Sequence, residues 1–569
     1  MKRNIFLLLL LIIIGAFLHF YNLNWGAPYY FNPDERNIAN AVSQLHFKNQ
    51  MNPHFFAYGS LPIYAIYFSG VLSNYLMRFV TPASPAAIFT VQFGQAVILS
   101  RFFSALFATL LIPILYMLGK KLKNETAGLL AAFLTTASTG FIQFAHFGTF
   151  EMWLTFFSIL LFSLCLQHLK KPHFVTFVLL GIVFGILVSV KVSSLVLFPI
   201  PIILFIGKQF GHHKKGLGTR EQGIKKAVIR NLLFVIRSCK DLLLFALIGI
   251  IVYLLTNPYA IIDQKDLLSS MNYESSVAIG TEPVFYTQNF ANTTPGIYQF
   301  LHVYPFLLNP LITLLFILAF FYLLSIMIKY KNKQHLLLVT FYLILFFSQA
   351  FLFVKWTRYM MPTLPFIYLV LAIVIARDPA SPETKQAQKR LPRTLQSLLT
   401  TGTIIICIVF AFSYFKTAFL SLDSRIAAVQ FATKIIPSDA KILSEPSDLG
   451  ALPFQDAFSN FDTFSFYDMD NPDTDATEGL LRQKLINSQY IVILSQRVLQ
   501  SRIENPKQFP KSNKFYQTLI SNHLGFQKIY ETPCDIFCKI TYLGDPVYWW
   551  EQTVSVFDHP TVFIFKKIS

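Results

Sequence analysis

Two adjacent carboxylates stand just beyond the first apolar segment of the chain. Asp34 and Glu35 lie in the segment Tyr29–Arg36, where Pro33 and several aromatic residues flank them. A carboxylate at a boundary between water and lipid is partly desolvated, which raises its pKa and makes it a better general base. The same pattern suits an aspartate that caps a short helix beginning after Pro33. The dipeptide therefore predicts either a proton acceptor or a helix cap.

Basic residues that interrupt apolar segments form a second group. Lys191 stands between two apolar runs, and Arg358 is followed directly by Tyr359. A lysine at such a position can either extend to the lipid headgroups or bind an anion. Charged groups beside membrane spans are costly and usually functional, and a guanidinium group matches phosphate oxygens bidentately. We therefore favour a phosphate site at Lys191 and Arg358.

Three further polar residues lie at the ends of apolar segments, namely Arg101, His146 and Glu151. Glu151 could shape a site together with His146, or it could simply favour the N-terminus of the following helix. Carboxylates and cations beside an apolar body suit displacement at a sugar carbon that carries a lipid phosphate. In this chemistry a carboxylate takes the proton of an acceptor hydroxyl, and the cations stabilise the departing phosphate.

The composition indicates which elements must position these residues. The chain has 569 residues, of which 54% are hydrophobic and 13% charged, whereas soluble domains carry about 25% charged residues. Its apolar runs are long enough to cross a bilayer, which takes roughly 20 residues each. The run Ile5–Phe20 predicts an uncleaved first helix. Ten further spans are expected near residues 98–119, 126–144, 152–169, 174–190, 193–207, 241–256, 304–327, 335–354, 361–376 and 397–415. The prediction is thus a polytopic α-helical membrane protein with about 11 transmembrane helices.

The distribution of charge predicts the orientation. The net charge of +18 arises from residues 1–416, where most lysines and arginines fall on alternate short loops. The positive-inside rule places these loops and the N-terminus in the cytoplasm. The candidate residues and the C-terminal domain then lie outside, at the plasma membrane. This distribution speaks against nucleic acid as a partner, and the interrupted apolar segment Leu61–Val80 is expected to lie at the membrane interface.

The domain organisation follows from the change in composition after residue 416. Residues 1–416 are predicted to form a transmembrane catalytic domain with external loops 22–97 and 257–303, and residues 417–569 a small soluble extracytoplasmic α/β domain. In the second domain Tyr490–Leu494 and Thr561–Phe565 resemble strands, and Ile426–Ile436 resembles a helix. Cys534 and Cys538 are either a local disulfide or two separate thiols.

Several short motifs resemble those of the GT-C membrane glycosyltransferases, in the group of protein O-mannosyltransferases and aminoarabinose transferases (family 39). The segment Phe31–Glu35 is similar to the Asp-Glu motif in the first external loop of that family. The other motifs, in the same order as in the family, are Leu99–Ser104 through Leu118–Lys121, His146–Phe156, Gly185–Ser194 and Arg358–Pro362. Glu151 stands where many members have Asp.

The resemblance implies a GT-C fold and an inverting transfer of a monosaccharide from a polyprenyl-phosphate donor to an acceptor. It implies that Asp34 is the catalytic base, that Glu35 supports it, and that Lys191 and Arg358 bind the donor phosphate. Arg101 is grouped with the phosphate-binding residues and with those that shape the site. The residues expected to shape the site are His146, Glu151 and Tyr359. Residues Asn257, Asp263, Glu274 and Tyr298 of the second external loop are expected to contact the acceptor or cap the cavity.

Two other functions stay open at this point. One is an oligosaccharyltransferase or ligase that uses a divalent metal held by several carboxylates; no cofactor is certain from the sequence. The other is a non-enzymatic transporter of lipid-linked sugars, which would usually show related halves and broken spans. The acceptor could be a protein, a lipid or a glycan, and the lipid bilayer is a partner in every case.

Overall fold

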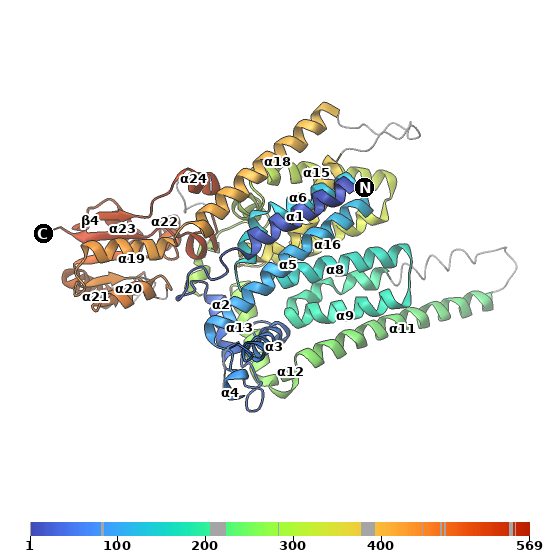
Figure 1. Cartoon of the computed structure of the whole chain (residues 1–569), viewed down its shortest axis with the longest axis horizontal. Helices are drawn as coiled ribbons and strands as arrows, with labels where there is room; N and C mark the ends of the chain where they lie inside the picture. The colour runs from blue at the N-terminus through green and yellow to red at the C-terminus, as the bar shows by residue number, and fades with distance from the viewer. Residues whose placement is uncertain are drawn as a thin grey trace.

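The computed structural model describes residues 2–80, 85–204, 224–282, 284–376, 393–446, 448–466, 469–470, 474–544, 550–551 and 553–568. The apolar helices of these ranges lie side by side in one bundle, and a smaller α/β region sits at one end of it (Figure 1). The N-terminus of the first helix lies at the opposite end of the bundle.

The predicted spans fall mainly on helices, but the span expected at 193–207 begins on the 3₁₀ helix η1 (Val192–Leu197), and residues 205–207 lie outside the described residues. The bundle helices are α1 (Lys2–Phe20), α5 (Phe93–Leu122), α6 (Glu125–Thr136), α7 (Thr139–Ala145), α8 (Glu151–Lys170), α9 (Phe174–Val190), α11 (Ile224–Thr256), α14 (Tyr304–Leu307), α15 (Pro310–Tyr330), α16 (Lys333–Ala350), α17 (Leu364–Ile375) and α18 (Arg393–Phe415). Within the described ranges six helices are long and apolar enough to cross a membrane, or seven if α6 and α7, which meet at 51°, form one span. The protein is therefore polytopic, and the total of about eleven spans stays a prediction.

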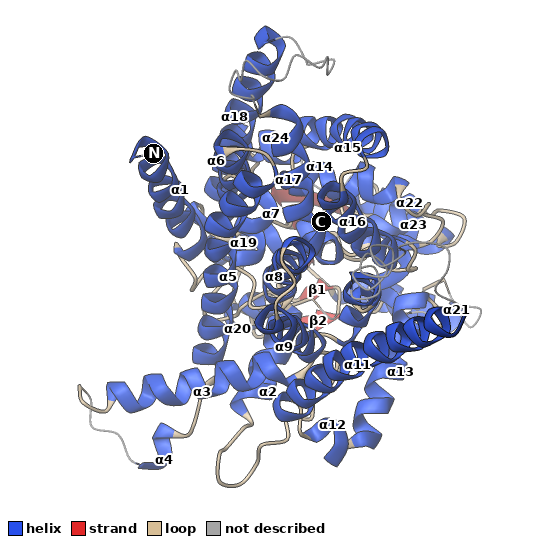
Figure 2. Ribbon diagram, turned by 90° about the vertical axis from the view of Figure 1, so that its right-hand side faces the viewer, coloured by secondary structure: helices blue, strands red, loops and turns tan. Residues whose placement is uncertain are grey.

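Short helices gather at the end of the bundle that adjoins the α/β region (Figure 1). They are α2 (Pro33–Ser43), α3 (Ser60–Met77), α4 (Pro85–Ile88), α12 (Tyr259–Ile262) and α13 (Gln264–Ile279). Helix α3 is seen end-on in Figure 1 and along its length in Figure 2, so it runs across the bundle. This orientation agrees with the interfacial position predicted for its interrupted apolar sequence.

The α/β region is built on a five-stranded sheet. Its strands are β1 (Ile442–Ser444), β2 (Phe461–Thr463), β3 (Tyr490–Ile493), β4 (Phe526–Glu531) and β5 (Phe563–Lys567), in the spatial order β2-β1-β3-β5-β4. Strands β2, β1 and β3 are parallel, whereas β5 is antiparallel to both of its neighbours. The flanking helices are α19 (Ser424–Ile435), α20 (Ala451–Ala457), α21 (Thr474–Asn487), α22 (Leu499–Glu504), α23 (Pro510–Ile520) and α24 (Ile536–Tyr542).

The central strand β3 explains why the sheet is covered on both faces. All four of its residues are buried. Ile491 and Ile493 pack into one apolar cluster, and Tyr490 and Val492 into another. Successive side chains of a strand point to opposite faces, so helices on each face bury alternate residues. The strands predicted near 490 and 561 and the helix predicted near 426 are confirmed, with ends shifted by one or two residues.

Buried polar contacts join the α/β region to the bundle. Asp558 accepts hydrogen bonds from Gln143 Nε2 (3.0 Å) and from the Tyr414 hydroxyl (2.8 Å). The guanidinium of Arg425 lies 3.9 Å from the ring centroid of Phe31, three residues before Asp34. These contacts connect the α/β region directly to the segment that carries the paired carboxylates.

The two cysteines near the C-terminus form a disulfide, Cys534–Cys538, which decides the alternative that the sequence leaves open. The disulfide encloses the start of α24. Cys165 and Cys407 are buried free thiols in the helical bundle.

Candidate active site

The paired carboxylates stand in the first turn of α2. Asn32, not Asp34, caps this helix: its side-chain oxygen accepts the backbone N–H of Asp34 at 3.0 Å and that of Glu35 at 3.4 Å. Pro33 occupies the first turn, where its lack of an N–H carries no penalty. The capping role considered for Asp34 is therefore wrong, and its carboxylate is available for other contacts.

The Asp34 carboxylate forms an ion pair with Arg358, whose Nη1 donates to Asp34 Oδ2. The two side chains are 24% and 21% exposed. Arg358 stands in the 3₁₀ turn η4 (Thr357–Thr363) at the start of α17, and its guanidinium lies 5.2 Å from the ring centroid of Trp356. The pair joins residues 324 positions apart, so the fold brings the predicted base and a predicted phosphate ligand into contact.

Arg358 also lines a polar pocket in the helical bundle. Lys191, Glu151 and Tyr359 line the same pocket. Its remaining lining residues are Leu154, Ser158, Ser193, Ser194, Val196, Leu197, Leu345, Ser348, Gln349 and Pro362. Four residues predicted from three separate segments of the sequence thus meet around one space.

Lys191 is placed by the end of α9. It follows the last residue of that helix, and its Nζ lies 4.9 Å from the ring centroid of Tyr359 and 5.4 Å from that of Tyr58. Aromatic faces attract an ammonium group but leave it able to bind an anion. The position between two rings favours the anion-binding alternative over extension to the headgroups.

Glu151 begins α8, as its alternative role predicts, but its carboxylate is buried. Neither carboxylate oxygen has a hydrogen-bond partner among the described residues. A buried acid without partners is costly, and functional sites are where such costs are usually kept. Its place in the pocket makes Glu151 a candidate to contact a bound molecule.

Glu35 has surroundings quite unlike those of Asp34. It forms a bidentate ion pair with Arg101, and its Oε2 accepts the backbone N–H of Gly148 at 3.0 Å. Both side chains of this pair are 0% exposed. Arg101 also donates to the carbonyl oxygens of Leu23 (2.7 Å) and Trp25 (2.8 Å).

The predicted grouping of Arg101 with the phosphate ligands is therefore not reproduced. Its guanidinium is buried against Glu35 and the loop after α1, and it is not among the described residues that line the pocket. A cation with a bidentate carboxylate and two carbonyl acceptors has few N–H groups left for a ligand. Arg101 instead fixes the start of α2.

His146 also lies apart from the pocket. Its ring nitrogens Nδ1 and Nε2 are each 2.7 Å from a carbonyl oxygen, of Ile142 and Tyr21 respectively. The ring stacks on Phe419 with 3.6 Å between centroids. His146 therefore shapes the site only indirectly, by packing the loop after α1 against the following helices.

Tyr58 is a site residue that the sequence does not single out. It is brought to Lys191 by its neighbour Gly59, whose N–H donates to Val190 O at 3.0 Å. A side chain at Gly59 would collide with the backbone carbonyl of Ser189, so this approach requires glycine. The glycine after Tyr58 is the one signal that marks this close contact in advance.

The segment that follows α11 contributes in two ways. Asn257 is buried and its Oδ1 accepts the N–H of Ser60 at 2.6 Å, so it holds the Tyr58 loop instead of facing the pocket. Glu274 on α13 lies within electrostatic range of Lys191 and Arg358. Partial desolvation raises the pKa of Glu274, and the two cations oppose this shift.

One group of described residues offers donor atoms to a metal. The side chains of His54, Asp263 and Asp266 bring their ligand atoms within 4.8 Å of one another. Asp263 Oδ2 also accepts a hydrogen bond from Asn52 Nδ2 at 2.7 Å. Carboxylate oxygens suit hard cations, but these residues are not among those that line the pocket. The use of a metal stays an open expectation.

Comparison with known proteins now bears on the class of the chain. Residues 82–215 match the family model described as dolichyl-phosphate-mannose-protein mannosyltransferase. This segment includes Arg101, Glu151 and Lys191. No curated protein sequence matches the chain.

Among solved structures, the oligosaccharyltransferase of Archaeoglobus fulgidus in its apo form is similar with a TM-score of 0.49 at 13% identity, over 99% of this chain and 88% of that one. ArnT from Cupriavidus metallidurans bound to undecaprenyl phosphate gives a TM-score of 0.44 at 11% identity, over 99% of this chain and 97% of that one.

The match over residues 82–215 agrees with the resemblance that the sequence motifs show in this segment. The chain is a polytopic α-helical membrane protein with a C-terminal α/β region.

Proposed function

We propose that the chain transfers a monosaccharide from a polyprenyl-phosphate donor to an acceptor hydroxyl at the outer membrane face, with inversion at the anomeric carbon. The observation that carries this proposal is the meeting of Asp34, Arg358 and Lys191 at one end of the helical bundle. An acid that can take a proton there adjoins two cations that can hold a phosphate.

Asp34 is proposed as the general base. Its carboxylate is partly exposed and is paired with Arg358. When the donor phosphate binds, the guanidinium can turn from Asp34 to the phosphate oxygens, which it matches in geometry. Asp34 is then free to accept the proton of the acceptor hydroxyl.

The reaction is a single displacement. The acceptor oxygen forms a bond to the anomeric carbon, its proton passes to Asp34, and the bond from that carbon to the phosphate oxygen breaks. The electron pair of the broken bond leaves with the lipid phosphate. Arg358 and Lys191 stabilise the charge that develops there, and attack opposite to the leaving group inverts the configuration.

Other residues are proposed to position these groups. Glu35 and Arg101 fix the first turn of α2, and Glu551 of the α/β region accepts the N–H of Thr357 at 2.9 Å, beside Arg358. Glu151, Tyr359 and His146 shape the site from the bundle side. The Cys534–Cys538 disulfide supports an extracytoplasmic α/β region, since disulfides persist in oxidising compartments.

The test is to incubate the purified full chain in lipid nanodiscs with a panel of polyprenyl-phosphate hexoses and candidate acceptors. Mass spectrometry follows the release of free polyprenyl phosphate, and NMR gives the anomeric configuration of the product. We expect release with one donor and an inverted product. Turnover with retention, or release only of a lipid diphosphate, would contradict the proposal.

A chelation arm addresses the metal-dependent alternative. With EDTA present, we expect the rate to be unchanged, because the proposed steps use only side chains of the pocket. A loss of activity that Mn²⁺ or Mg²⁺ restores would favour the oligosaccharyltransferase-like chemistry and direct attention to His54, Asp263 and Asp266.

A further inference from the structure

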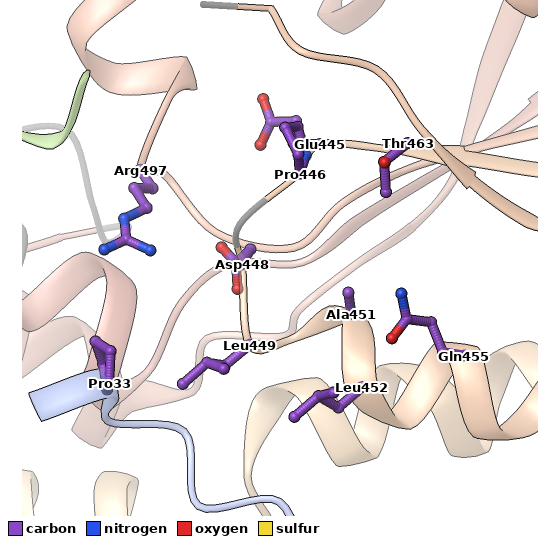
Figure 3. A pocket seen from close by; sticks show the side chains of 10 residues that line it. All are labelled: Pro33, Glu445, Pro446, Asp448, Leu449, Ala451, Leu452, Gln455, Thr463 and Arg497. Carbon is purple, nitrogen blue, oxygen red and sulfur yellow. The ribbon is translucent and has the colours of Figure 1, made fainter. Parts of the chain in front are cut away.

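A second cavity lies where the α/β region meets the helix that carries Asp34. Its volume is about 330 Å³, at the lower end of the roughly 300–1,000 Å³ typical of small-molecule sites. Its lining residues are Pro33, Glu445, Pro446, Asp448, Leu449, Ala451, Leu452, Gln455, Thr463 and Arg497. Figure 3 shows Asp448 between Arg497 on one side and Gln455 on the other, with Pro33 of α2 below Arg497.

The topology of the sheet explains why a cavity forms here. Glu445 and Asp448 follow β1, Arg497 follows β3, and Thr463 is the last residue of β2. These three strands are parallel and have the order β2-β1-β3. After β1 the chain runs to β2, at one edge of the sheet, and after β3 it runs to β4, at the other edge. The loops after β1 and β3 therefore diverge. Open α/β sheets bind ligands at this kind of switch point, outside the carboxyl ends of the strands.

Glu445 gives an independent indication of a ligand. Its side chain is 1% exposed. The Tyr516 hydroxyl donates to Oε1, but Oε2 has no hydrogen-bond partner among the described residues. Burial raises the pKa of Glu445 to about 8. At neutral pH it is therefore mostly protonated, and it can donate a hydrogen bond as well as accept one.

The remaining polar groups suit a neutral partner. Asp448 accepts the N–H of Gly450 at 2.8 Å and the Ser495 hydroxyl, which fixes its carboxylate beside the cavity. The Asp448 carboxylate would repel an anion, and the guanidinium of Arg497 would repel a cation. A hydroxyl group can donate to the first and accept from the second.

The apolar lining completes the argument. Pro33, Leu449 and Leu452 present aliphatic surface to the same space. A sugar ring has hydroxyl groups around its rim and C–H groups on its faces, so it matches a cavity of this mixed character.

We propose that this cavity binds a saccharide unit of the acceptor, so that the acceptor is a glycan. The inference rests on the proposed function, because it supplies the hydroxyl to the neighbouring base. Pro33 lines the cavity and directly precedes Asp34. A saccharide held there can extend one of its residues toward the start of α2.

Saturation-transfer NMR tests the proposal with the full chain in nanodiscs that contain no glycoside detergent. The probes are the methyl glycosides of glucose, galactose, mannose and N-acetylglucosamine, with lysine amide as the charged comparison. We expect saturation transfer to at least one glycoside and none to lysine amide. Transfer to lysine amide alone would overturn the assignment.

Two variants locate the binding. Asp448→Asn and Gln455→Ala are expected to weaken glycoside binding roughly tenfold and threefold, because the first replaces a charged acceptor by a neutral amide and the second removes a hydrogen-bonding amide. Gln455 is exposed on α20, so its replacement should not impair folding. The matched control is Asp439→Asn, an exposed residue before the opposite end of β1. Equal affinities in all four proteins would overturn the proposal.

The outcome can be separated from that of the proposed function. Asp34→Asn should lose transfer but keep glycoside binding. If the wild type transfers sugar while Asp448→Asn has an unchanged acceptor KM, the cavity proposal fails and the proposed function stands. If glycosides bind through Asp448 but no donor is consumed, the proposed function fails and the saccharide site stands.

Discussion

Two arginine–carboxylate pairs start from neighbouring residues of α2 and differ in almost every physical respect. The Arg101–Glu35 pair is 0% exposed and bidentate, with additional backbone partners on both sides. The Arg358–Asp34 pair is about one-fifth exposed and stands beside a polar pocket. The first pair is built to stay closed, and the second can exchange its partners with a substrate. One dipeptide thus supplies both a structural anchor and a candidate catalyst.

The largest loss of folding stability is expected when the buried Arg101–Glu35 pair is broken. Arg101→Ala leaves Glu35 charged and unpaired in the protein interior, which typically costs about 3–5 kcal/mol. Arg358→Ala should cost about 1 kcal/mol or less, because its pair is partly exposed. Thermal unfolding of both variants in nanodiscs measures the difference. Equal losses of stability would remove the contrast between the two pairs.

A smaller loss of folding stability is expected at Gly59, where the backbone of the loop after α2 meets the end of α9. Gly59→Ala adds a methyl group against the Ser189 carbonyl, and such overpacking costs about 1–3 kcal/mol. It should also displace Tyr58 from Lys191 and raise the KM for the donor. Gly402→Ala in α18 is the control, because nothing lies within 4 Å of the added methyl group. A donor KM unchanged by Gly59→Ala would show that Tyr58 does not position Lys191.

Removing the second cation extends the comparison to the pocket. Lys191→Met keeps the length of the side chain but loses the charge. We expect the donor KM to rise roughly tenfold with little change in stability, since a charged hydrogen bond contributes about 1.5–3 kcal/mol. Steady-state kinetics with varied donor measures this. An unchanged donor KM with a lower melting temperature would instead assign Lys191 a structural role.

A third carboxylate sharpens the comparison, because Asp558 accepts hydrogen bonds from two neutral donors, Gln143 and Tyr414. Burial raises the pKa of Asp558 to about 7. The folded protein therefore holds this proton more tightly than the unfolded chain, and the resulting stability is lost as pH rises from about 4 through about 7. Between pH 5 and pH 8 the melting temperature of Asp558→Asn should fall less than that of the wild type. Parallel pH profiles would show that Asp558 does not titrate in this range.

The sequence predicts the helical bundle well because each span carries its own signal. A run of apolar residues specifies a membrane helix regardless of its neighbours, and the continuous apolar run Tyr490–Leu494 specifies a strand that is buried on both faces. The charges that lie between apolar runs, at Lys191 and Arg358, are also visible in advance. Their meeting with Asp34 is implied only by the order of motifs in the family.

Other features depend on contacts that no local pattern contains. Arg101 and Arg358 look alike in the sequence, and only the surroundings of their partners separate an anchor from a ligand. Pro33 suggests that Asp34 caps the helix, but Asn32 is the cap. Its side-chain oxygen lies 3.0 Å from the backbone nitrogen of Asp34. The cavity at the carboxyl ends of β1 and β3 arises from strand order, which the short strands do not reveal.

The most direct test of the central claim compares Asp34→Asn with the wild type in a single-turnover assay of free polyprenyl phosphate, at saturating donor and acceptor. The substitution keeps the shape and the hydrogen bond to Arg358 but removes the base. We expect the rate to fall by about 10²–10⁴, with an unchanged melting temperature. A variant that transfers sugar at the wild-type rate would contradict the assignment of Asp34 as the proton acceptor.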